Sequence, residues 1–137
     1  MFHVKQNKSL KISNKVGVLG ENIAVRFLLD KNYSIIERNY LEKTGEIDII
    51  CTRDKTFYFV EVKARSVSDL SKVSSKDIGV FEMVTSKKIN NMSKTIAIYL
   101  TKNKVSHETL WQIMVFGVYI DQINKQSKVV VLDNVIN

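Results

Sequence analysis

The sequence predicts an α/β fold in which helices flank a mixed β-sheet, and three observations lead to this prediction. Apolar residues recur with helical spacing over about residues 15–30 and again over about 84–102. Between these segments lie runs rich in Ile, Phe, Tyr and Val that alternate as strands do. A long apolar run over 109–120 has the composition of a buried strand. The order helix, three strands, helix, then one or two strands predicts one sheet covered by helices on its faces.

The first predicted helix begins at about Lys15 and ends at about Asp30. One side of it is apolar, and small residues extend that arc. The residues of the arc are Leu19, Ile23, Phe27, Gly17, Gly20, Ala24 and Leu28. Small side chains in the middle of the arc would let this helix lie close against the sheet.

The predicted strands follow directly. Residues 33–40 form the first strand, 43–45 the turn, and 46–51 and 56–65 a β-hairpin whose arms are separated by the polar residues 52–55. Residues 66–80, rich in Ser, Asp and Lys, predict a loop or short turns. The second helix carries one apolar face, formed by Ile89, Met92, Ile96, Tyr99 and Leu100. Residues 109–120 and 128–132 complete the sheet as strands.

Length and composition place the chain among small globular proteins. At 137 residues, with 45% hydrophobic and 26% charged residues, it is long enough for one domain with a real core. We expect a polar, basic arm over 1–14 and a single domain over 15–137. No apolar stretch approaches a membrane span, and the first nineteen residues lack the apolar segment of a signal peptide. A single cysteine, Cys51, fits a reducing, cytoplasmic environment.

The net charge of +7 is concentrated in two blocks without acids, residues 1–20 and 83–107. Basic blocks on both sides of an acidic centre suit a polyanion such as nucleic acid. The alternative is that these lysine-rich faces are simply solvated.

The candidate site lies in the hairpin. Side chains two apart on a strand share a face, so Glu61 and Lys63 point the same way. If the hairpin brings Asp48 beside Glu61, two carboxylates and one ammonium converge as a site for a hard cation such as Mg²⁺ or Mn²⁺. This is the apparatus needed to hydrolyse a phosphodiester, with Lys63 next to the attacking water or the phosphate. The alternative is that Glu61 and Lys63 only pair with neighbours at a strand end.

Three further residues are candidates for the same site. Glu21 lies at the edge of the arc that faces the sheet, so it could reach the hairpin, although the helix dipole alone also favours an acid there. Arg65 shares the face of Lys63 and is a candidate phosphate contact, or an ordinary exposed arginine. Lys88 lies on the flank of the second helix's apolar face and could extend toward the site, whereas Lys87 and Lys94 point away.

Other residues receive simpler interpretations. Cys51 is expected in the core, and the aromatic rings of Phe57, Phe59 and Trp111 are expected to pack rather than to stack on bases. Glu46 directly follows Gly45 and marks a turn. His3 and His107 have no metal-ligand spacing and are assigned no role.

Four blocks together carry a family resemblance. They are Gly17-x-x-Gly20-Glu21-x-x-Ala24, Arg38-Asn39-Tyr40, Gly45-Glu46-Ile47-Asp48 and Phe59-Val60-Glu61-Val62-Lys63-x-Arg65. In this order and spacing they resemble the YraN family of small bacterial proteins. The resemblance continues through Lys88 and Ala97-x-Tyr99-Leu100 to Asp133-Asn134, so it covers about residues 15–135.

The resemblance implies a restriction-endonuclease-like αβββαβ core of the PD-(D/E)xK type, similar to Holliday-junction resolvases. It assigns Asp48, Glu61 and Lys63 as the catalytic triad and Glu21 as the helix-borne acid. It also implies that the backbone carbonyl of Val62 is a metal ligand. One position departs from the family pattern: Gln112 stands where an aspartate is usual.

The function expected from residues and resemblance is a Mg²⁺-dependent nuclease acting on DNA, with branched or repair and recombination intermediates as one substrate class. The alternative is a nucleic-acid-binding module that keeps the fold without the chemistry. A third possibility is a protein-interaction scaffold that binds no nucleic acid. Because resolvases of this fold need two active centres, the resemblance is compatible with a homodimer.

Overall fold

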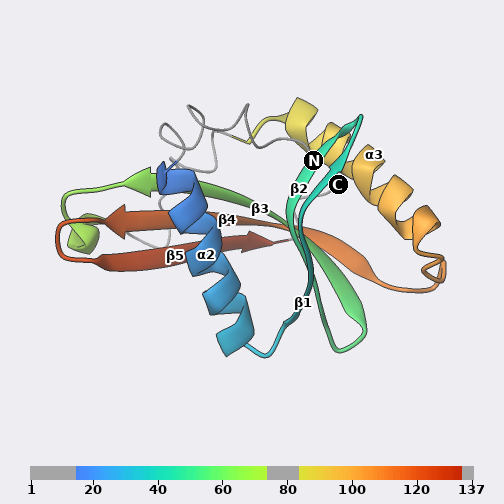
Figure 1. Cartoon of the computed structure of the whole chain (residues 1–137), viewed down its shortest axis with the longest axis horizontal. Coiled ribbons are helices and arrows are strands. Elements are labelled where there is room, and N and C mark those ends of the chain that lie inside the picture. Colours follow the sequence, from blue (N-terminus) through green and yellow to red (C-terminus); the bar gives the residue numbers. More distant parts are fainter. Residues whose placement is uncertain (1–14, 74–83, 134–137) are drawn as a thin grey trace.

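A computed structural model describes residues 15–73 and 84–133, and Figure 1 shows the elements. Their order is α2 (Lys15–Asp30), β1 (Ser34–Glu42), β2 (Gly45–Arg53), β3 (Thr56–Ser66), the 3₁₀ turn η1 (Leu70–Lys72), α3 (Ser86–Lys102), β4 (Trp111–Asp121) and β5 (Gln126–Asp133). The predicted α/β class and the order of elements are confirmed. The arm predicted over residues 1–14 and much of the loop predicted over 66–80 lie outside the described residues.

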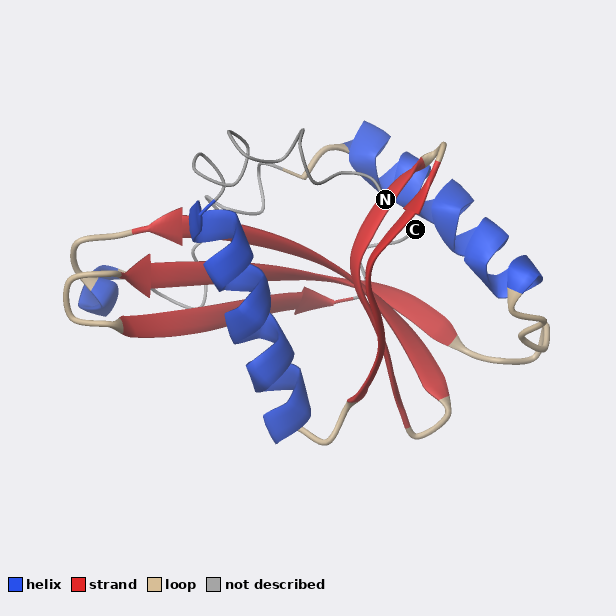
Figure 2. Cartoon of the chain, in the orientation of Figure 1, coloured by secondary structure: helices blue, strands red, loops and turns tan. Residues whose placement is uncertain are grey.

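The strands form one mixed sheet in the order β1-β2-β3-β4-β5. All neighbours are antiparallel except β3 and β4, which are parallel. A parallel pair needs a crossover connection, and α3 lies in that connection. Figure 2 shows α2 crossing the strands β3–β5 and α3 lying beside the hairpin of β1 and β2.

Each helix covers its own apolar core. On the α2 face, Ala24 and Leu28 pack in a buried cluster with Ile49, Val60 and Phe116. The second cluster places residues of α3 against β2, β3 and β4; its members are Ile47, Ile50, Phe59, Met92, Ile96, Tyr99 and Ile113. Cys51 is buried in the first cluster, and Phe57 and Trp111 pack against the second, as predicted. Neither described helix has both the length and the apolar character that a membrane crossing requires.

The predicted apolar arc of α2 is wrong at two positions. The buried residues of this helix are Gly20, Ala24 and Leu28, which are spaced by four and form a narrow stripe. Leu19 is 39% exposed because it lies about 100° around the helix from Gly20. Gly17 is exposed, and a Cβ atom added there would have no neighbour within 4 Å, so the first turn of α2 extends past its packing surface.

Gly20 sets how closely α2 approaches the sheet. A Cβ atom at this position would lie 2.5 Å from Cβ of Ala64 on β3, a separation that packed atoms do not tolerate. The prediction that small residues bring this helix close to the sheet therefore holds at Gly20. The close approach matters for function because Glu21 is the next residue.

The turn between β1 and β2 is shorter than predicted, and most strand ends differ from the prediction by one or two residues. The strands β1 and β2 pair as far as Glu42 with Gly45, so the turn contains only Lys43 and Thr44 rather than residues 43–45. Gly45 has φ 151°, a conformation that side chains rarely adopt. The helix α3 begins after Thr85, whose hydroxyl accepts a hydrogen bond from the backbone N–H of Lys88 over 3.1 Å.

Candidate active site

The candidate site lies where β2 and β3 separate. Their ladder runs from Ile49 opposite Val60 to Arg53 opposite Thr56. Beyond Val60, β3 continues beside β4 as far as Ser66, and β2 continues beside β1. Figure 1 shows the β1–β2 hairpin bending away toward α3. If the register is continued by one pair, Asp48 lies opposite Glu61, at the mouth of this fork.

A change of face in β2 accompanies the fork. Residues two apart on a regular strand share a face. Ile49 nevertheless packs in the α2 cluster, while Ile47 packs in the α3 cluster. The strand therefore twists strongly around Asp48. The sequence alone gives only the alternation of apolar and polar residues, which does not reveal this twist.

Asp48 takes over the hydrogen bond that the strands no longer make. Its Oδ2 accepts a hydrogen bond from the backbone N–H of Val62 over 2.8 Å. Burial, and secondarily the negative charge of Glu61, raise the pKa of Asp48 to about 8. The hydrogen bond donated by the N–H of Val62 lowers this pKa, and the negative charges of Glu21 and Glu46 raise it, but these effects are smaller. The carboxyl groups of Asp48 and Glu61 are thus close enough to repel each other when both are charged.

Glu61 is the buried acid of the site, with 3% of its surface exposed. Its two carboxylate oxygens have different surroundings. Oε2 lies 3.4 Å from Nζ of Lys63 and 3.7 Å from Nζ of Lys88. Oε1 is buried and has no hydrogen-bond partner among the described residues. A buried carboxylate oxygen without a partner is costly, so this atom points to a ligand.

The two lysines reach Glu61 from different elements. Lys63 comes from β3 itself, and Lys88 comes from the first turn of α3. Their side chains are 28% and 36% exposed, so both ammonium groups lie between the buried acid and solvent. The contact of Lys88 with the site, from a helix far along the chain, requires the crossover that places α3 beside β2 and β3.

Glu21 is held near the site by β1. The side-chain amide of Asn39 donates to both carboxylate oxygens of Glu21, over 3.2 and 3.3 Å. Arg38 lies 3.6 Å away and is itself fixed by a 2.9 Å hydrogen bond to Asn22. Burial raises the pKa of Glu21, and the bond from Asn39 opposes that shift.

Asn39 is a candidate site residue to which the sequence alone assigned no role. The pairs on either side of it, Arg38 with Ile49 and Tyr40 with Ile47, place Asn39 opposite Asp48. Asn39, Asp48 and Glu61 thus form a row across three strands. The sequence offered one signal, the place of Asn39 in the Arg38-Asn39-Tyr40 block. The structure adds its φ of 54°, a left-handed conformation that asparagine tolerates well.

The remaining predicted residues lie nearby with fewer contacts. Arg65 is exposed on β3, two residues beyond Lys63 on the same strand. For Val62 the structure gives the N–H bond to Asp48, and a ligand role for its carbonyl oxygen stays a prediction. Gln112 is half-buried on β4 opposite Tyr58, on the far side of the ladder from the fork.

The atoms present fit a hard divalent cation. Within residues 15–73 and 84–133, no group of three or more His, Cys, Asp or Glu side chains is arranged to hold a metal ion. Glu21 therefore does not complete a three-acid site with Asp48 and Glu61. Two carboxylates are nevertheless a common protein contribution to Mg²⁺, because waters and substrate phosphate complete the octahedron. A cation between them would also remove the repulsion that raises the pKa of Asp48.

Comparison with known proteins identifies the family. The profile of "Uncharacterised protein family UPF0102" matches residues 20–124. A UPF0102 protein of Campylobacter hominis is 38% identical over 110 residues, which cover 80% of this chain and 88% of that protein. A UPF0102 protein of Campylobacter lari is 38% identical over 78% of this chain and 86% of its own length. A UPF0102 protein of Syntrophomonas wolfei is 36% identical over 65% of this chain and 71% of its own length.

The matched range includes all the candidate site residues, the whole of α3, and α2 from Gly20 onward. The resemblance drawn from the four sequence blocks is thereby confirmed. The chain belongs to the UPF0102 family, the same family as YraN.

Proposed function

We propose that this protein is a cytoplasmic, Mg²⁺-dependent nuclease that hydrolyses phosphodiester bonds in DNA. The observation that carries the proposal is Glu61, a buried carboxylate with one unpartnered oxygen, beside Asp48 and two lysines. Burying such a charge is costly unless a ligand completes it. Structural ion pairs at a strand end do not require an unpartnered oxygen, so the arrangement favours a ligand site over the simple pairing of Glu61 with its neighbours.

Asp48 and Glu61 would hold the ion, together with the backbone carbonyl of Val62. The N–H of Val62 fixes the carboxyl group of Asp48 through the 2.8 Å bond to Oδ2. When bound, the ion acidifies water and neutralises charge that develops on the phosphate.

The lysines supply positive charge where the phosphate approaches. Lys63 and Lys88 are both partly exposed, and each has its ammonium within 4 Å of Glu61 Oε2. Lys63 would orient the attacking water or contact the scissile phosphate, and Lys88 and Arg65 would bind phosphate groups. Glu21, held by Asn39, would act as a positioning acid at the edge of the site.

A cleavage panel tests this proposal. The purified protein should cleave at least one of duplex, flapped or four-way DNA or RNA when Mg²⁺ or Mn²⁺ is added, with branched DNA as the first substrate. Glu61→Gln and Lys63→Met should each lower the rate by at least about 100-fold. Glu37→Gln removes an exposed acid from β1 and should change little. A wild-type protein inactive on every substrate with both ions would refute the nuclease proposal.

A second candidate function is nucleic-acid binding without cleavage. It is favoured by α3 and the first residues of the following loop, since 84–107 contain five lysines and no acid before Glu108. In that case the logarithm of affinity should fall with the logarithm of salt concentration by about 0.9 for each neutralised phosphate of duplex DNA. Replacement of Asp48 and Glu61 by their amides would then leave affinity unchanged.

A further inference from the structure

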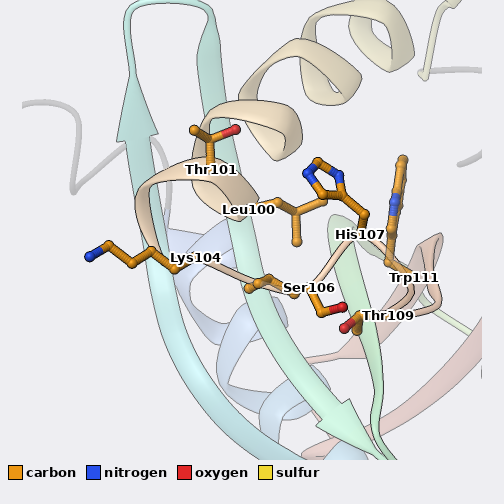
Figure 3. A pocket seen from close by; sticks show the side chains of 8 residues that line it. Leu100, Thr101, Lys104, Ser106, His107, Thr109 and Trp111 are labelled. Carbon is orange, nitrogen blue, oxygen red and sulfur yellow. The ribbon is translucent and has the colours of Figure 1, made fainter.

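A pocket at the far end of α3 has no part in the site described above. It has a volume of about 480 Å³ and lies between the end of α3, the following loop and the start of β4. Figure 3 shows its lining, with the rings of His107 and Trp111 projecting in the same direction. The complete lining is Leu100, Thr101, Lys104, Val105, Ser106, His107, Thr109 and Trp111.

The pocket combines aromatic surface with hydroxyl groups. Trp111 is half-buried and packs edge-to-face against Phe59, with centroids 5.8 Å apart, so one part of its ring is fixed by the core. His107 is exposed. The hydroxyls of Ser106 and Thr109 lie below these rings in Figure 3. An indole ring anchored by the core beside an exposed imidazole, with hydroxyls nearby, suits a flat, polar-edged group such as a nucleobase.

Charge along α3 connects this pocket with the candidate active site. Lys87, Lys94 and Thr101 are seven residues apart and lie on one exposed face of the helix. Lys87, Lys94 and Lys104 make no ion pair with any described residue, whereas Lys88 and Lys102 pair with Glu61 and Glu42. From Lys88 to Leu100 the helix rises about 18 Å, which corresponds to roughly five phosphates of a nucleic-acid strand.

The backbone at Lys104 adds an independent observation. The helix ends in a Schellman motif, in which the N–H of Lys104 bonds to the carbonyl of Thr101 and that of Val105 to Leu100. The left-handed residue of this motif is usually glycine, but here it is Lys104 with φ 54°. A lysine at this position costs stability relative to glycine. Lys104 is one of the lining residues, and its side chain extends away from the rings of His107 and Trp111 (Figure 3).

We propose that this pocket is a base-binding subsite for an unpaired nucleotide of a nucleic-acid strand that runs along the exposed face of α3. A base would stack on Trp111 and His107, and the lysines would contact the backbone leading toward Glu61. The proposal rests on the proposed function for the identity of the ligand as nucleic acid. It does not depend on cleavage.

Trp111 is the chain's one tryptophan, so its fluorescence reports on this pocket directly. The test uses Glu61→Gln protein in a chelator, titrated with an oligothymidylate of about 12 nucleotides and with an abasic strand of the same charge. The thymidylate should quench Trp111 saturably, and the abasic strand should not. His107→Ala should weaken binding of the thymidylate by roughly 5- to 150-fold, the range for loss of one stacked base.

Two matched variants separate binding from folding. Lys104 and Lys125 both adopt left-handed conformations, with φ 54° and 56°, but Lys125 lies in the turn between β4 and β5. Replacement of either by glycine should stabilise the fold. Lys104→Gly alone should weaken the affinity for thymidylate and reduce its salt dependence, by about 0.7 in the logarithmic slope for single strands.

The outcomes decide between this subsite and the proposed nuclease function. Equal quenching by both strands, no quenching, or equal effects of the two glycine variants would overturn the base-binding subsite. Quenching by thymidylate in a protein that cleaves nothing would refute the nuclease while supporting the subsite. Cleavage without quenching would support the nuclease and overturn the base-binding subsite.

Discussion

Glu61 combines burial, charge and an unpartnered oxygen in one residue. Such a group is unfavourable in the folded protein without a ligand, because among the described residues two partly exposed lysines are its ion-pair partners. Residues kept for binding or chemistry at the expense of stability are common in functional sites.

We therefore expect Glu61→Gln to stabilise the metal-free protein while it abolishes metal binding. The amide keeps the shape, removes the repulsion with Asp48 and should raise the free energy of unfolding by about 1 kcal/mol. Urea denaturation in a chelator measures the change. A marked loss of stability would mean that the ion pairs of Glu61 with Lys63 and Lys88 hold the fold together.

Asn39 is expected to act on chemistry through Glu21. Asn39→Gly removes the amide that binds both oxygens of Glu21 but allows the left-handed backbone at this position. Loss of a partner that orients an active-site group should lower the cleavage rate roughly tenfold, with the thermal midpoint little changed. Asn22→Ala, which frees Arg38 but leaves Asn39 in place, is the control and should have the smaller effect.

At the scale of elements, the packing of α2 on β3 fixes where Glu21 can lie. Gly20→Ala should destabilise the protein by about 1–3 kcal/mol, because a methyl group would overlap Ala64. Gly17→Ala is the matched control in the same helix. It meets nothing within 4 Å and should stabilise by up to about 1 kcal/mol. Chemical denaturation compares the two, and equal effects would show that the close approach at Gly20 is unimportant.

The turn between β4 and β5 depends on Asp121. Its carboxylate accepts hydrogen bonds from the backbone N–H groups of Asn124 and Ile123 and from the side chain of Asn124, over 3.0, 3.1 and 2.8 Å. These bonds, those from Asn124 foremost, lower the pKa of Asp121. A lowered folded-state pKa means stability that is present above the unfolded pKa and is lost as pH falls through the folded value.

We expect the wild type to be more stable than Asp121→Asn, by an amount that depends on pH. The urea midpoint of the wild type should exceed that of the variant at pH 7, and the difference should shrink below about pH 4, where aspartate is protonated in the unfolded chain. A difference that stays constant from neutral to acid pH would exclude a contribution from the charge.

Element types were predictable because each rests on local chemistry. The end of α2 at about Asp30 was predicted correctly, and the hairpin of β2 and β3 follows from alternation around a polar break. The buried stripe of α2 was predicted less well, with Leu19 and Gly17 wrongly included. Helical spacing defines an arc, but only the position of the sheet decides how much of that arc is covered.

At the scale of the whole molecule, binding of a divalent ion where β2 and β3 separate should stabilise the entire fold. A ligand that binds only the folded state stabilises it by about 2.7 kcal/mol at roughly 100 times its dissociation constant. Mg²⁺ or Mn²⁺ should therefore raise the thermal midpoint of the wild type, and removal by a chelator should reverse the change. Asp48→Asn and Glu61→Gln should show no such shift. Equal shifts in all three proteins would place ion binding elsewhere.

The sequence by itself determined the class of fold and its order of elements, because helix and strand periodicity are local properties of the chain. It predicted Asp48 and Glu61 as neighbours on the condition that the hairpin brings them together. Only the tertiary structure decided that the strands part at these acids, that Lys88 arrives from α3 and that Asn39 secures Glu21. It also placed His107 beside Trp111, two residues for which the sequence alone predicted no binding role. These contacts join residues far apart in the chain, and they form only when a twisted sheet and a crossover helix bring the segments together.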